Sequence, residues 1–457
     1  MVHLDPPPVP SRSMVASAAS ISYVLRSMLP RRSLVGIAVL ALAARLAYVL
    51  LVRPSVPLVS DGQTYHLLAR NIASGRGYIA PFDWFFRHQA RPTAEFGPVH
   101  PTVLAVASLL GARSVLAHQV FLAVIGSATP VLTAVLAGRL TRDRRIALAS
   151  GVVAALHPML LGSDGALMSE TVYTVLGLLL ALALSDVVGS GARRSVVVVG
   201  AVLGLAVLTR GDALLLLPFV IIPVLIGVTR ELDRDAAVRL ATVVGVAALV
   251  VLPWVARNAA RFDGKIVVSN NVGSLVSGAN CPETYAGPGI GSWDFRCAYR
   301  TPLLGANEAE TSAELRASGL NYLRQHRDRL PLVVPARVGR AWGIVHPFGQ
   351  ARAEEADGRV FGLQAAGVLV DWALLVFFVL GVTALRARRV PLALLVGPVL
   401  MVTALCALTY GNSRFREVAE PALIIGAVAG MVAVSTGDPA ASIDDASIPE
   451  FAGDRSA

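Results

Sequence analysis

The feature that most constrains this chain is a series of apolar segments of membrane-spanning length, separated by short loops that carry arginine. A helix needs roughly 20 apolar residues to cross the hydrocarbon core of a bilayer. About ten segments meet or approach this length. They are Leu34–Val52, Val115–Gly138, Ile146–Gly162, Thr171–Val188, Val196–Leu208, Ala213–Val228, Val238–Ala256, Phe361–Leu385, Val390–Tyr410 and Val418–Val434. The sequence therefore predicts an all-α polytopic membrane protein.

The composition supports a membrane protein and argues against a nucleic-acid-binding protein. Only 15% of the 457 residues are charged, whereas soluble domains carry about 25%. The net charge of +10 comes almost wholly from arginine, since Lys265 is the single lysine. The basic residues lie in short clusters between apolar segments and not along one soluble face. This distribution argues against a nucleic-acid partner and indicates membrane topology.

The arginine clusters predict the orientation of the chain, because cytoplasmic loops are enriched in Lys and Arg. With the N-terminus inside, the cytoplasmic arginines are Arg26, Arg31, Arg32, Arg139, Arg142, Arg144, Arg145, Arg193, Arg194, Arg230, Arg234, Arg239, Arg386, Arg388 and Arg389. Both termini are then cytoplasmic. The apolar stretch Pro101–Leu110 is too short to cross, and a crossing there would place Arg139–Arg145 outside. We therefore expect it to be a helix that lies at the interface or is re-entrant.

These boundaries predict five regions. Residues 1–33 form a cytoplasmic, partly disordered segment, and residues 34–256 form a transmembrane domain whose outer loop, 53–114, carries surface helices. The first helix has no clear cleavage pattern before it and is expected to be a retained anchor. Residues 257–360 form a small extracytoplasmic section or cap. Residues 361–434 form the last three helices, and 435–457 a disordered cytoplasmic tail.

Polar stretches with acidic and basic residues gather on the outer side in this topology. They are "VPLVSDGQTYHLLARNIASGRGYIAP" (56–81), "RPTAEFGPVHP" (91–101), "GSDGALMSET" (162–171), "LTRGDALLLLP" (208–218) and "YGNSRFREVAEP" (410–421). The inner side carries mostly arginine. This asymmetry indicates chemistry at the outer membrane–water boundary of the cell membrane.

The order of these stretches, together with "LAGRLTRDRRIALAS" and "MSETVY", resembles bacterial polyprenyl-phosphate-sugar glycosyltransferases. These are the family 39 type, related to protein O-mannosyltransferases and to enzymes that add aminoarabinose to lipid A. The resemblance covers roughly residues 34–434. It implies a GT-C helical fold, an active site that faces outward, and a functional acidic residue in the first outer loop, which here is Asp61. The partners implied are a polyprenyl-phosphate-linked sugar, membrane lipid, and a polysaccharide, glycolipid or protein acceptor.

The chemistry of such a transfer fits the acidic and basic residues on this side. A base must accept the proton of the acceptor hydroxyl, a role for Asp61 that Glu95 or Glu170 can assist. Cations must hold the departing phosphate, and arginine binds phosphate in a bidentate manner. The arginines at outer helix ends are Arg210, Arg414 and Arg416. A phosphate held in this way requires no metal, so no cofactor is expected, although a divalent cation is not excluded.

Further residues are candidates for substrate binding, namely Tyr65, His66, Arg70, His100 and Arg45. Arg45 lies within the first apolar segment. An arginine there either serves a function, snorkels to the interface, or pairs with a neighbouring helix, for instance with Asp371. Structural interpretations remain open for the others. Asp is also a favoured helix N-cap, and Glu170 at a helix start also favours the helix dipole.

Two other classes of function share this architecture. A lipid-sugar transporter or flippase would also be a polytopic helical protein with arginine at its loops, and a non-catalytic membrane scaffold would keep the same fold. The sequence shows no convincing internal repeat, and most acidic residues lie at helix ends, which favours the enzyme. The identities of the sugar, the acceptor and the lipid carrier are not encoded in any recognisable motif.

The outer section before the last three helices contains Cys281 and Cys297, whereas Cys406 lies in a predicted spanning helix. Two cysteines in one loop of an oxidising compartment favour a disulfide. Closing a loop of this size contributes on the order of 3 kcal/mol in the chain-entropy model. We therefore expect a disulfide between Cys281 and Cys297.

The arginine pattern yields a test of sidedness. A cysteine introduced at Ser292 is expected to react with a membrane-impermeant thiol reagent in intact cells, because residues 264–359 are predicted to be extracytoplasmic. Labelling that occurs only after cell lysis would reverse the orientation.

Overall fold

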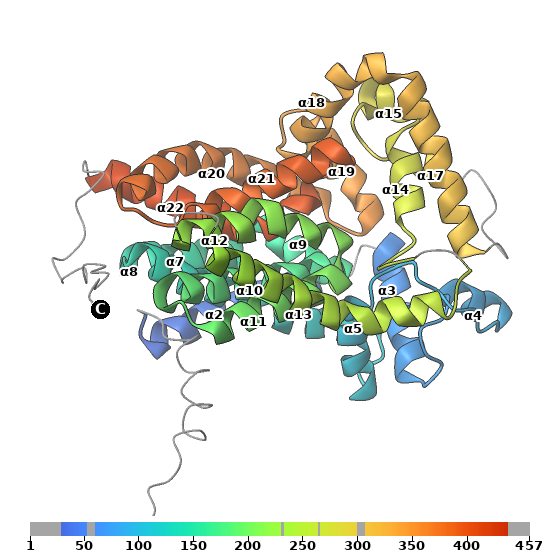
Figure 1. The fold of residues 1–457 in the computed structure, drawn as a ribbon, viewed down its shortest axis with the longest axis horizontal. Coiled ribbons are helices and arrows are strands. Elements are labelled where there is room, and N and C mark those ends of the chain that lie inside the picture. The colour runs from blue at the N-terminus through green and yellow to red at the C-terminus, as the bar shows by residue number, and fades with distance from the viewer. Residues whose placement is uncertain (1–28, 53–59, 230–232, 264–265, 299–306, 437–457) are drawn as a thin grey trace, which may run out of the picture.

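The computed structural model describes residues 29–52, 60–229, 233–263, 266–298 and 307–436, and these ranges are mostly helical (Figure 1). Within them the only bridge between extended backbone segments joins Ile79 and Pro92. The predicted all-α class is thereby confirmed. The expectations of disorder for residues 1–28 and 437–457 lie outside the described residues, and the boundaries of the five regions remain predictions.

A bundle of long apolar helices forms the body of the molecule. Its first half contains α2 (Arg31–Ala47, continued as a π-helix to Val52), α6 (Val115–Gly126), α7 (Ala128–Thr141), α8 (Arg144–Leu156), α9 (Pro158–Ala166), α10 (Glu170–Ser190) and α11 (Arg193–Thr209). The helical stretch from Gly211 to Thr229 comprises η3 (Gly211–Leu215), η4 (Leu217–Ile221) and α12 (Ile222–Thr229). It is followed by α13 (Arg234–Ala259), α20 (Phe361–Ala387), α21 (Ala393–Leu408) and α22 (Glu420–Thr436).

All ten predicted segments lie wholly or largely within these helices. In the described part of the chain, six helices are long and apolar enough to cross a membrane, and the bent pair α8–α9 would make a seventh. The helices α11, α21 and α22 are shorter, with 17, 16 and 17 residues. The number of crossings therefore remains a prediction.

Local chemistry sets several helix ends. The side chain of Asp143 accepts hydrogen bonds from the backbone N–H groups of Arg145 and Ile146, which starts α8. His157 precedes Pro158 and cannot readily adopt helical dihedrals there, so α8 ends and α9 begins after a bend of 45°. The spanning segment predicted at Ile146–Gly162 is thus bent between α8 and α9.

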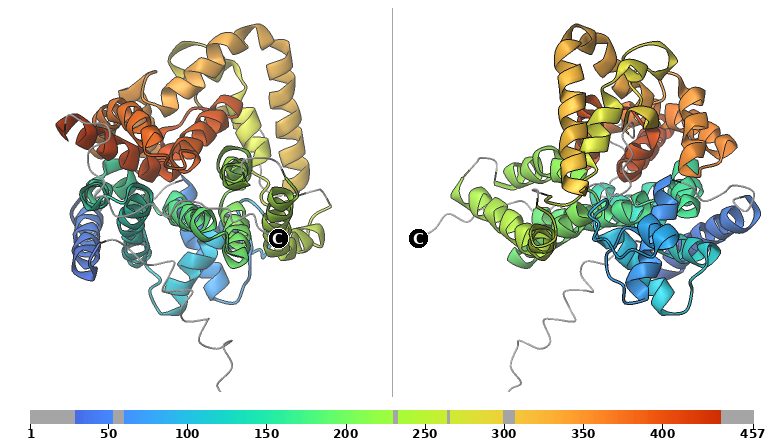
Figure 2. Two further views of the ribbon diagram at one scale, coloured as in Figure 1. Left: turned by 60° about the vertical axis from the view of Figure 1, so that its left-hand side comes forward. Right: turned by 90° about the vertical axis from the view of Figure 1, so that its right-hand side faces the viewer.

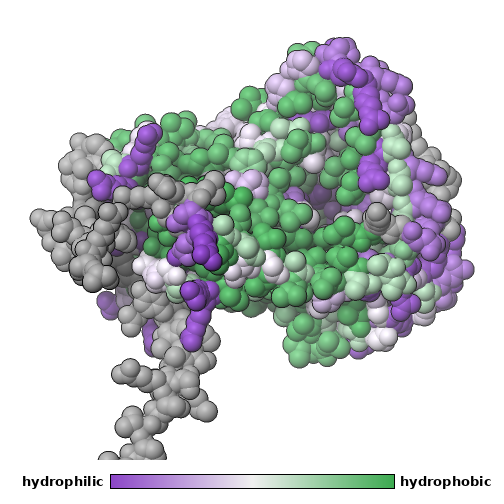
Figure 3. Space-filling model, viewed as in Figure 1, coloured by the Kyte–Doolittle hydropathy of each residue, from purple (hydrophilic) through white to green (hydrophobic). Residues whose placement is uncertain are grey.

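Surface helices and a helical cap gather at one end of the bundle (Figures 1 and 2). The outer loop forms α3 (Ser60–Ala73), α4 (Pro81–Arg87) and α5 (Val99–Leu109). The cap contains α14 (Val272–Ala279), α15 (Pro282–Tyr285), α16 (Phe295–Ala298), α17 (Glu308–Gln325), α18 (Leu330–Ala341) and α19 (Pro347–Ala353). The arginine-rich turn between α7 and α8 lies at the opposite end (Figure 1). A broad apolar surface separates the two hydrophilic ends (Figure 3), as expected for a protein that spans a bilayer.

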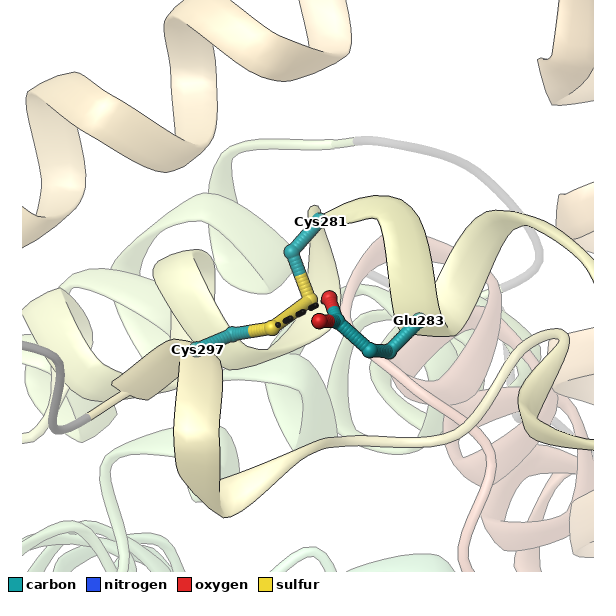
Figure 4. A group of neighbouring side chains, drawn as sticks. All are labelled: Cys281, Glu283 and Cys297. Atoms are coloured by element: carbon teal, nitrogen blue, oxygen red, sulfur yellow. Dashed lines mark hydrogen bonds between the residues drawn. A yellow bond between two sulfur atoms is a disulfide. The ribbon is translucent and has the colours of Figure 1, made fainter.

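Two contacts fix the cap. The predicted disulfide between Cys281 and Cys297 is present and ties α15 to α16 (Figure 4). The Glu308 carboxylate, at the start of α17, accepts hydrogen bonds from the Ala94 backbone N–H at 2.9 Å and from the Asn270 amide at 2.7 Å. The cap is therefore attached to the outer loop that contains α3.

The last helices pack through glycine. A Cβ atom on Gly381 of α20 would lie 1.8 Å from the Gly426 carbonyl oxygen, and one on Gly430 would lie 2.1 Å from the Phe377 carbonyl oxygen. The spacing Gly426-x-x-x-Gly430 is the small-residue pattern that lets two membrane helices approach closely. Because the approach is between backbones, no side chain can move aside.

The close approach of α20 and α22 predicts that one methyl group added at Gly381 destabilises the protein. Gly381→Ala is expected to lower the thermal unfolding midpoint, because overpacking costs about 1–3 kcal/mol. Gly245→Ala in α13 is the matched control, since its Cβ would meet nothing within 4 Å. Thermal unfolding followed by size-exclusion chromatography in detergent measures both variants. Equal midpoints for the two would refute the packing account.

Candidate active site

The candidate site lies where the first turns of α3 and α10 meet the segment between α21 and α22. Asp61 lies in the first turn of α3 and is 32% exposed. Its carboxylate lies 3.4 Å from Nη1 of Arg414, which belongs to the 3₁₀ segment η8 (Ser413–Val418). Helix α3 is one of the surface helices predicted for the outer loop. Its acidic residue contacts a predicted phosphate-binding arginine more than 350 residues away in sequence.

Glu170 joins a second arginine to this pair. It is the first residue of α10, and its carboxylate accepts a hydrogen bond from Nη1 of Arg210 at 2.8 Å. The same carboxylate oxygen lies 3.7 Å from Nε of Arg414. Arg210 follows α11 and also donates to Asp212 at 3.0 Å. Glu170 is thus the anion that holds the two guanidinium groups near each other.

Aromatic rings complete the placement of the arginines. The Phe415 ring lies beneath both guanidinium groups, 5.3 Å from that of Arg210 and 5.6 Å from that of Arg414. Tyr173 faces Arg210 at 5.7 Å, and the Tyr410 hydroxyl lies 3.4 Å from Nη2 of Arg414. Such cation–π contacts are worth about 0.5–2 kcal/mol each. They hold the guanidinium groups without neutralising them.

Sequence reasoning missed Asp357 as well as Asp212, Tyr410 and Phe415. Asp357 ends the 3₁₀ segment η7 (Glu354–Asp357), and its carboxylate lies 3.3 Å from Nη1 of Arg414. Tyr410 and Phe415 belong to the polar stretch 410–421, and Asp212 follows Arg210, so their proximity to predicted residues was a usable signal. Asp357 lies in an acidic loop before a spanning segment, where nothing in the sequence distinguishes it from its neighbours.

Tyr65 belongs to the site by proximity. It is buried on α3 against Phe96 and His100, with ring centroids 4.5 Å and 4.6 Å away. Burial raises the pKa of the Tyr65 hydroxyl, and the charge of Asp61 adds to the rise. A neutral Tyr65 therefore lies one helical turn from Asp61.

Other predicted residues are not brought to Asp61. His66 is buried against His118, 3.1 Å between their Nδ1 atoms, and burial lowers the pKa of His66 to about 4. His100 is buried with Nε2 3.0 Å from the Leu167 carbonyl oxygen. Arg70 is exposed at the far end of α3.

Two predicted arginines form buried ion pairs inside the bundle. Nε of Arg45 lies 2.7 Å from Asp164, and both side chains are 1% exposed. The pairing of Arg45 with Asp371 that the sequence allowed is not formed, because Asp371 is paired with Arg416 and lies 3.1 Å from His157. A buried arginine needs such a partner.

Electrostatics favour a basic Asp61. Burial raises the pKa of its carboxyl group above the usual 3.8, Arg414 opposes this, and the negative charges of Asp357 and Glu170 raise it further. Burial lowers the pKa of Arg414, but the neighbouring Asp357, Glu170 and Asp61 outweigh this and raise it above the usual value, so its guanidinium stays charged. A carboxylate with a raised pKa is a better proton acceptor.

Glu95 is a second carboxyl group beside the site, half-buried in the outer loop. Burial raises its pKa from the ordinary 4.5 to about 8, and the charges of Glu308 and Asp61 contribute. Glu95 is therefore protonated at neutral pH and suited to donate a hydrogen bond.

Groups able to hold a metal lie elsewhere. In the described ranges, two groups of three side chains bring their possible ligand atoms close together. The first is Cys281, Glu283 and Cys297, and the second is His157, Asp371 and Glu420. The first group contains the disulfide, beside which the Glu283 carboxylate lies 3.0 Å from Cys297 Sγ (Figure 4). The second is already neutralised by Arg416, which contacts both carboxylates. Neither group includes Asp61.

Comparison with known proteins agrees with this architecture. Residues 92–256 match a family model described as dolichyl-phosphate-mannose-protein mannosyltransferase. No curated protein sequence matches the chain. The archaeal oligosaccharyltransferase AglB from Archaeoglobus fulgidus, solved with an inhibitory peptide and a dolichol-phosphate, is similar over 88% of this chain and 50% of that chain, with 14% identity and a TM-score of 0.52. This chain thus spans about half the length of that protein.

A second solved structure is more distant in shape. ArnT from Cupriavidus metallidurans, bound to undecaprenyl phosphate, is similar over 88% of this chain and 79% of the ArnT chain, with 17% identity and a TM-score of 0.41. The family-model match and the fold shared with AglB confirm the resemblance to polyprenyl-phosphate-sugar glycosyltransferases and the GT-C-type fold that it implied.

The environment of Glu95 predicts a pH dependence of stability. Its folded pKa of about 8 exceeds the ordinary 4.5, so the unfolded chain loses this proton at lower pH than the folded chain. The wild-type protein should lose thermal stability relative to Glu95→Gln as the pH rises from about 5 to about 8, with a constant difference above that range. Glu310→Gln on the exposed face of α17 is the control. Unfolding midpoints of wild type and Glu95→Gln that stay parallel between those pH values would show that Glu95 titrates normally.

Proposed function

We propose that this protein is an integral-membrane glycosyltransferase that moves a sugar from a polyprenyl monophosphate to an extracytoplasmic acceptor hydroxyl. The observation that carries the proposal is the contact of the partly exposed Asp61 carboxylate with Arg414, beside Glu170 and Arg210, on a GT-C-type fold. A base and two phosphate-binding cations thus lie together at the hydrophilic end of the bundle, beneath the cap.

An apolar crevice supports a lipid-linked donor. It lies between α7, α10, α21 and α22 and is lined by Gly177, Leu180, Val418 and Ala422, among others. Gly177 lies two turns below Glu170 on α10, and Val418 lies four residues after Arg414. The crevice volume of about 20 Å³ is too small for a polyprenyl tail, so the crevice marks only the apolar side from which a tail would bring its phosphate toward Arg414 and Arg210.

The geometry supports an inverting displacement. Asp61 takes the proton of the acceptor hydroxyl as its oxygen attacks the anomeric carbon. The bond between that carbon and the phosphate oxygen breaks, and the electron pair leaves with the phosphate. Arg414 and Arg210 stabilise the charge that develops on the phosphate, as preorganised donors do. Attack opposite to the leaving group inverts the anomeric configuration.

The other residues have supporting roles in this proposal. Glu170 orients both guanidinium groups, and Glu95, protonated at neutral pH, donates to a sugar or acceptor oxygen. Tyr65 lines the pocket next to Asp61. Arg416 and Arg45 stabilise the bundle through their buried ion pairs.

Removal of the base tests the proposal. Asp61→Asn keeps the size of the side chain but cannot accept a proton, so turnover should fall by roughly 10² to 10⁴. Folding and donor binding should be retained, because Asn replaces Asp at a helix start at little cost. Asp83→Asn in α4 of the same outer loop is the control and should keep wild-type turnover. Near-normal transfer by well-folded Asp61→Asn would remove Asp61 from the mechanism.

A further inference from the structure

We propose that Asp357 is a positioning residue of this site, which shares Arg414 with Asp61 and thereby keeps Asp61 available as a base until the donor phosphate takes the guanidinium. This inference rests on the proposed glycosyltransferase function. It assigns a role to a loop that sequence reasoning did not connect with the site.

The carboxylates of Asp61 and Asp357 contact the same nitrogen atom of Arg414. Nη1 of Arg414 lies 3.4 Å from Oδ2 of Asp61 and 3.3 Å from Oδ2 of Asp357. Asp357 also accepts a hydrogen bond from the Ser60 hydroxyl at 3.3 Å through its other oxygen. Since Ser60 precedes Asp61, the Asp357 carboxylate is fixed against the start of α3 as well as against Arg414.

Contacts on both sides of Asp357 fix its segment against η8. Glu354 accepts from the Ser413 hydroxyl, and the buried Arg359 guanidinium pairs with Glu417. Asp357 lies between these two contacts and meets Arg414. Gly358 has a positive φ of 77°, a conformation that glycine adopts without strain, and it turns the chain so that Arg359 points into the bundle. Three successive contacts therefore place Asp357 on Arg414.

Negative charge predominates around Arg414. The titratable and charged groups that face Asp61, Asp357 and Arg414 are Glu170, Glu95, Glu354, Arg210, Tyr65 and Tyr410. An entering phosphate must compete with carboxylates for Arg414. When the phosphate takes Nη1, Asp61 and Asp357 both lose their shared cation, so the affinity of Asp61 for a proton increases as the donor arrives.

Asp357 has two effects on Asp61 in this arrangement. Its own negative charge favours proton uptake by Asp61, and it prevents Arg414 from pairing with Asp61 alone. Asp357→Asn removes both effects. The acid limb of the pH profile of kcat/KM, which reports the free enzyme, should then move to lower pH by roughly 0.5 to 1 unit. Because Asp61 becomes a weaker base, kcat at the pH optimum should fall by roughly two- to threefold. The donor KM should not rise, because one competing carboxylate has been removed.

The matched control is Glu355→Gln. Glu355 lies in the same η7 segment and is exposed, and its substitution removes the same amount of charge. Its pH profile should match that of the wild-type protein. Asp357→Glu retains the carboxylate, so its acid limb should lie close to that of the wild-type protein. An unchanged acid limb in Asp357→Asn, or an increased donor KM as its only effect, overturns the inference.

A measurement on the wild-type protein covers the case in which Asp357→Asn does not fold. Calorimetric titration with a polyprenyl-phosphate sugar in the absence of acceptor, in buffers of different ionisation enthalpy near pH 6, should show proton uptake on binding, because the phosphodiester of this donor does not itself titrate there. No uptake contradicts the exchange of Arg414 from carboxylates to phosphate. The wild-type protein and Asp61→Asn are assayed in parallel. A wild-type protein that transfers no sugar contradicts the proposed function, and an active Asp61→Asn removes the base on which this inference rests. An inactive Asp61→Asn with an unshifted Asp357→Asn profile overturns only the role of Asp357.

Discussion

The pairing of buried charges around η8 determines much of the structure at the outer end of the bundle. A charged side chain in a low-dielectric interior must be paired, and in η8 three charged residues find partners on different elements. Arg416 pairs with Asp371 of α20, Glu417 with Arg359, and Arg414 with Asp61, Asp357 and Glu170. Because Arg416 and Glu417 are anchored inward, Arg414 is presented to the partly exposed side. The same set of contacts thus joins the last helices to α3 and α10.

The cap and the outer loop extend this arrangement. Arg257 at the end of α13 donates to the carbonyl groups of Thr93 and Tyr78, at 2.7 Å and 2.9 Å. Glu308 holds the backbone at Ala94 from the cap side. Glu95 therefore directly follows two fixed backbone positions, Thr93 and Ala94, and its position relative to Asp61 depends on cap attachment. Changes in the cap can alter the acid–base properties of the site without contact with Asp61.

Sequence patterns determined the parts of the structure that depend on local composition. Membrane-length apolar segments predicted the helices, and two cysteines in one outer section predicted the disulfide. The order of the polar stretches predicted that Asp61, Glu170, Arg210 and Arg414 lie on one side. Which residues pair is a tertiary property: Arg45 pairs with Asp164 and not with Asp371, because Asp371 faces Arg416. Asp357 was missed for the same reason, since its role depends on Arg414 and Ser60, both distant in sequence.

The central claim is that the sugar is cleaved from its lipid phosphate and joined to an acceptor by this protein. Mass spectrometry after purified protein is mixed with a panel of polyprenyl-phosphate sugars and envelope extract tests it most directly. The account predicts an acceptor that gains one glycosyl residue, together with free polyprenyl phosphate in equal amount. Lipid-linked sugar that remains intact while it crosses the membrane of reconstituted vesicles would contradict the account and identify a transporter.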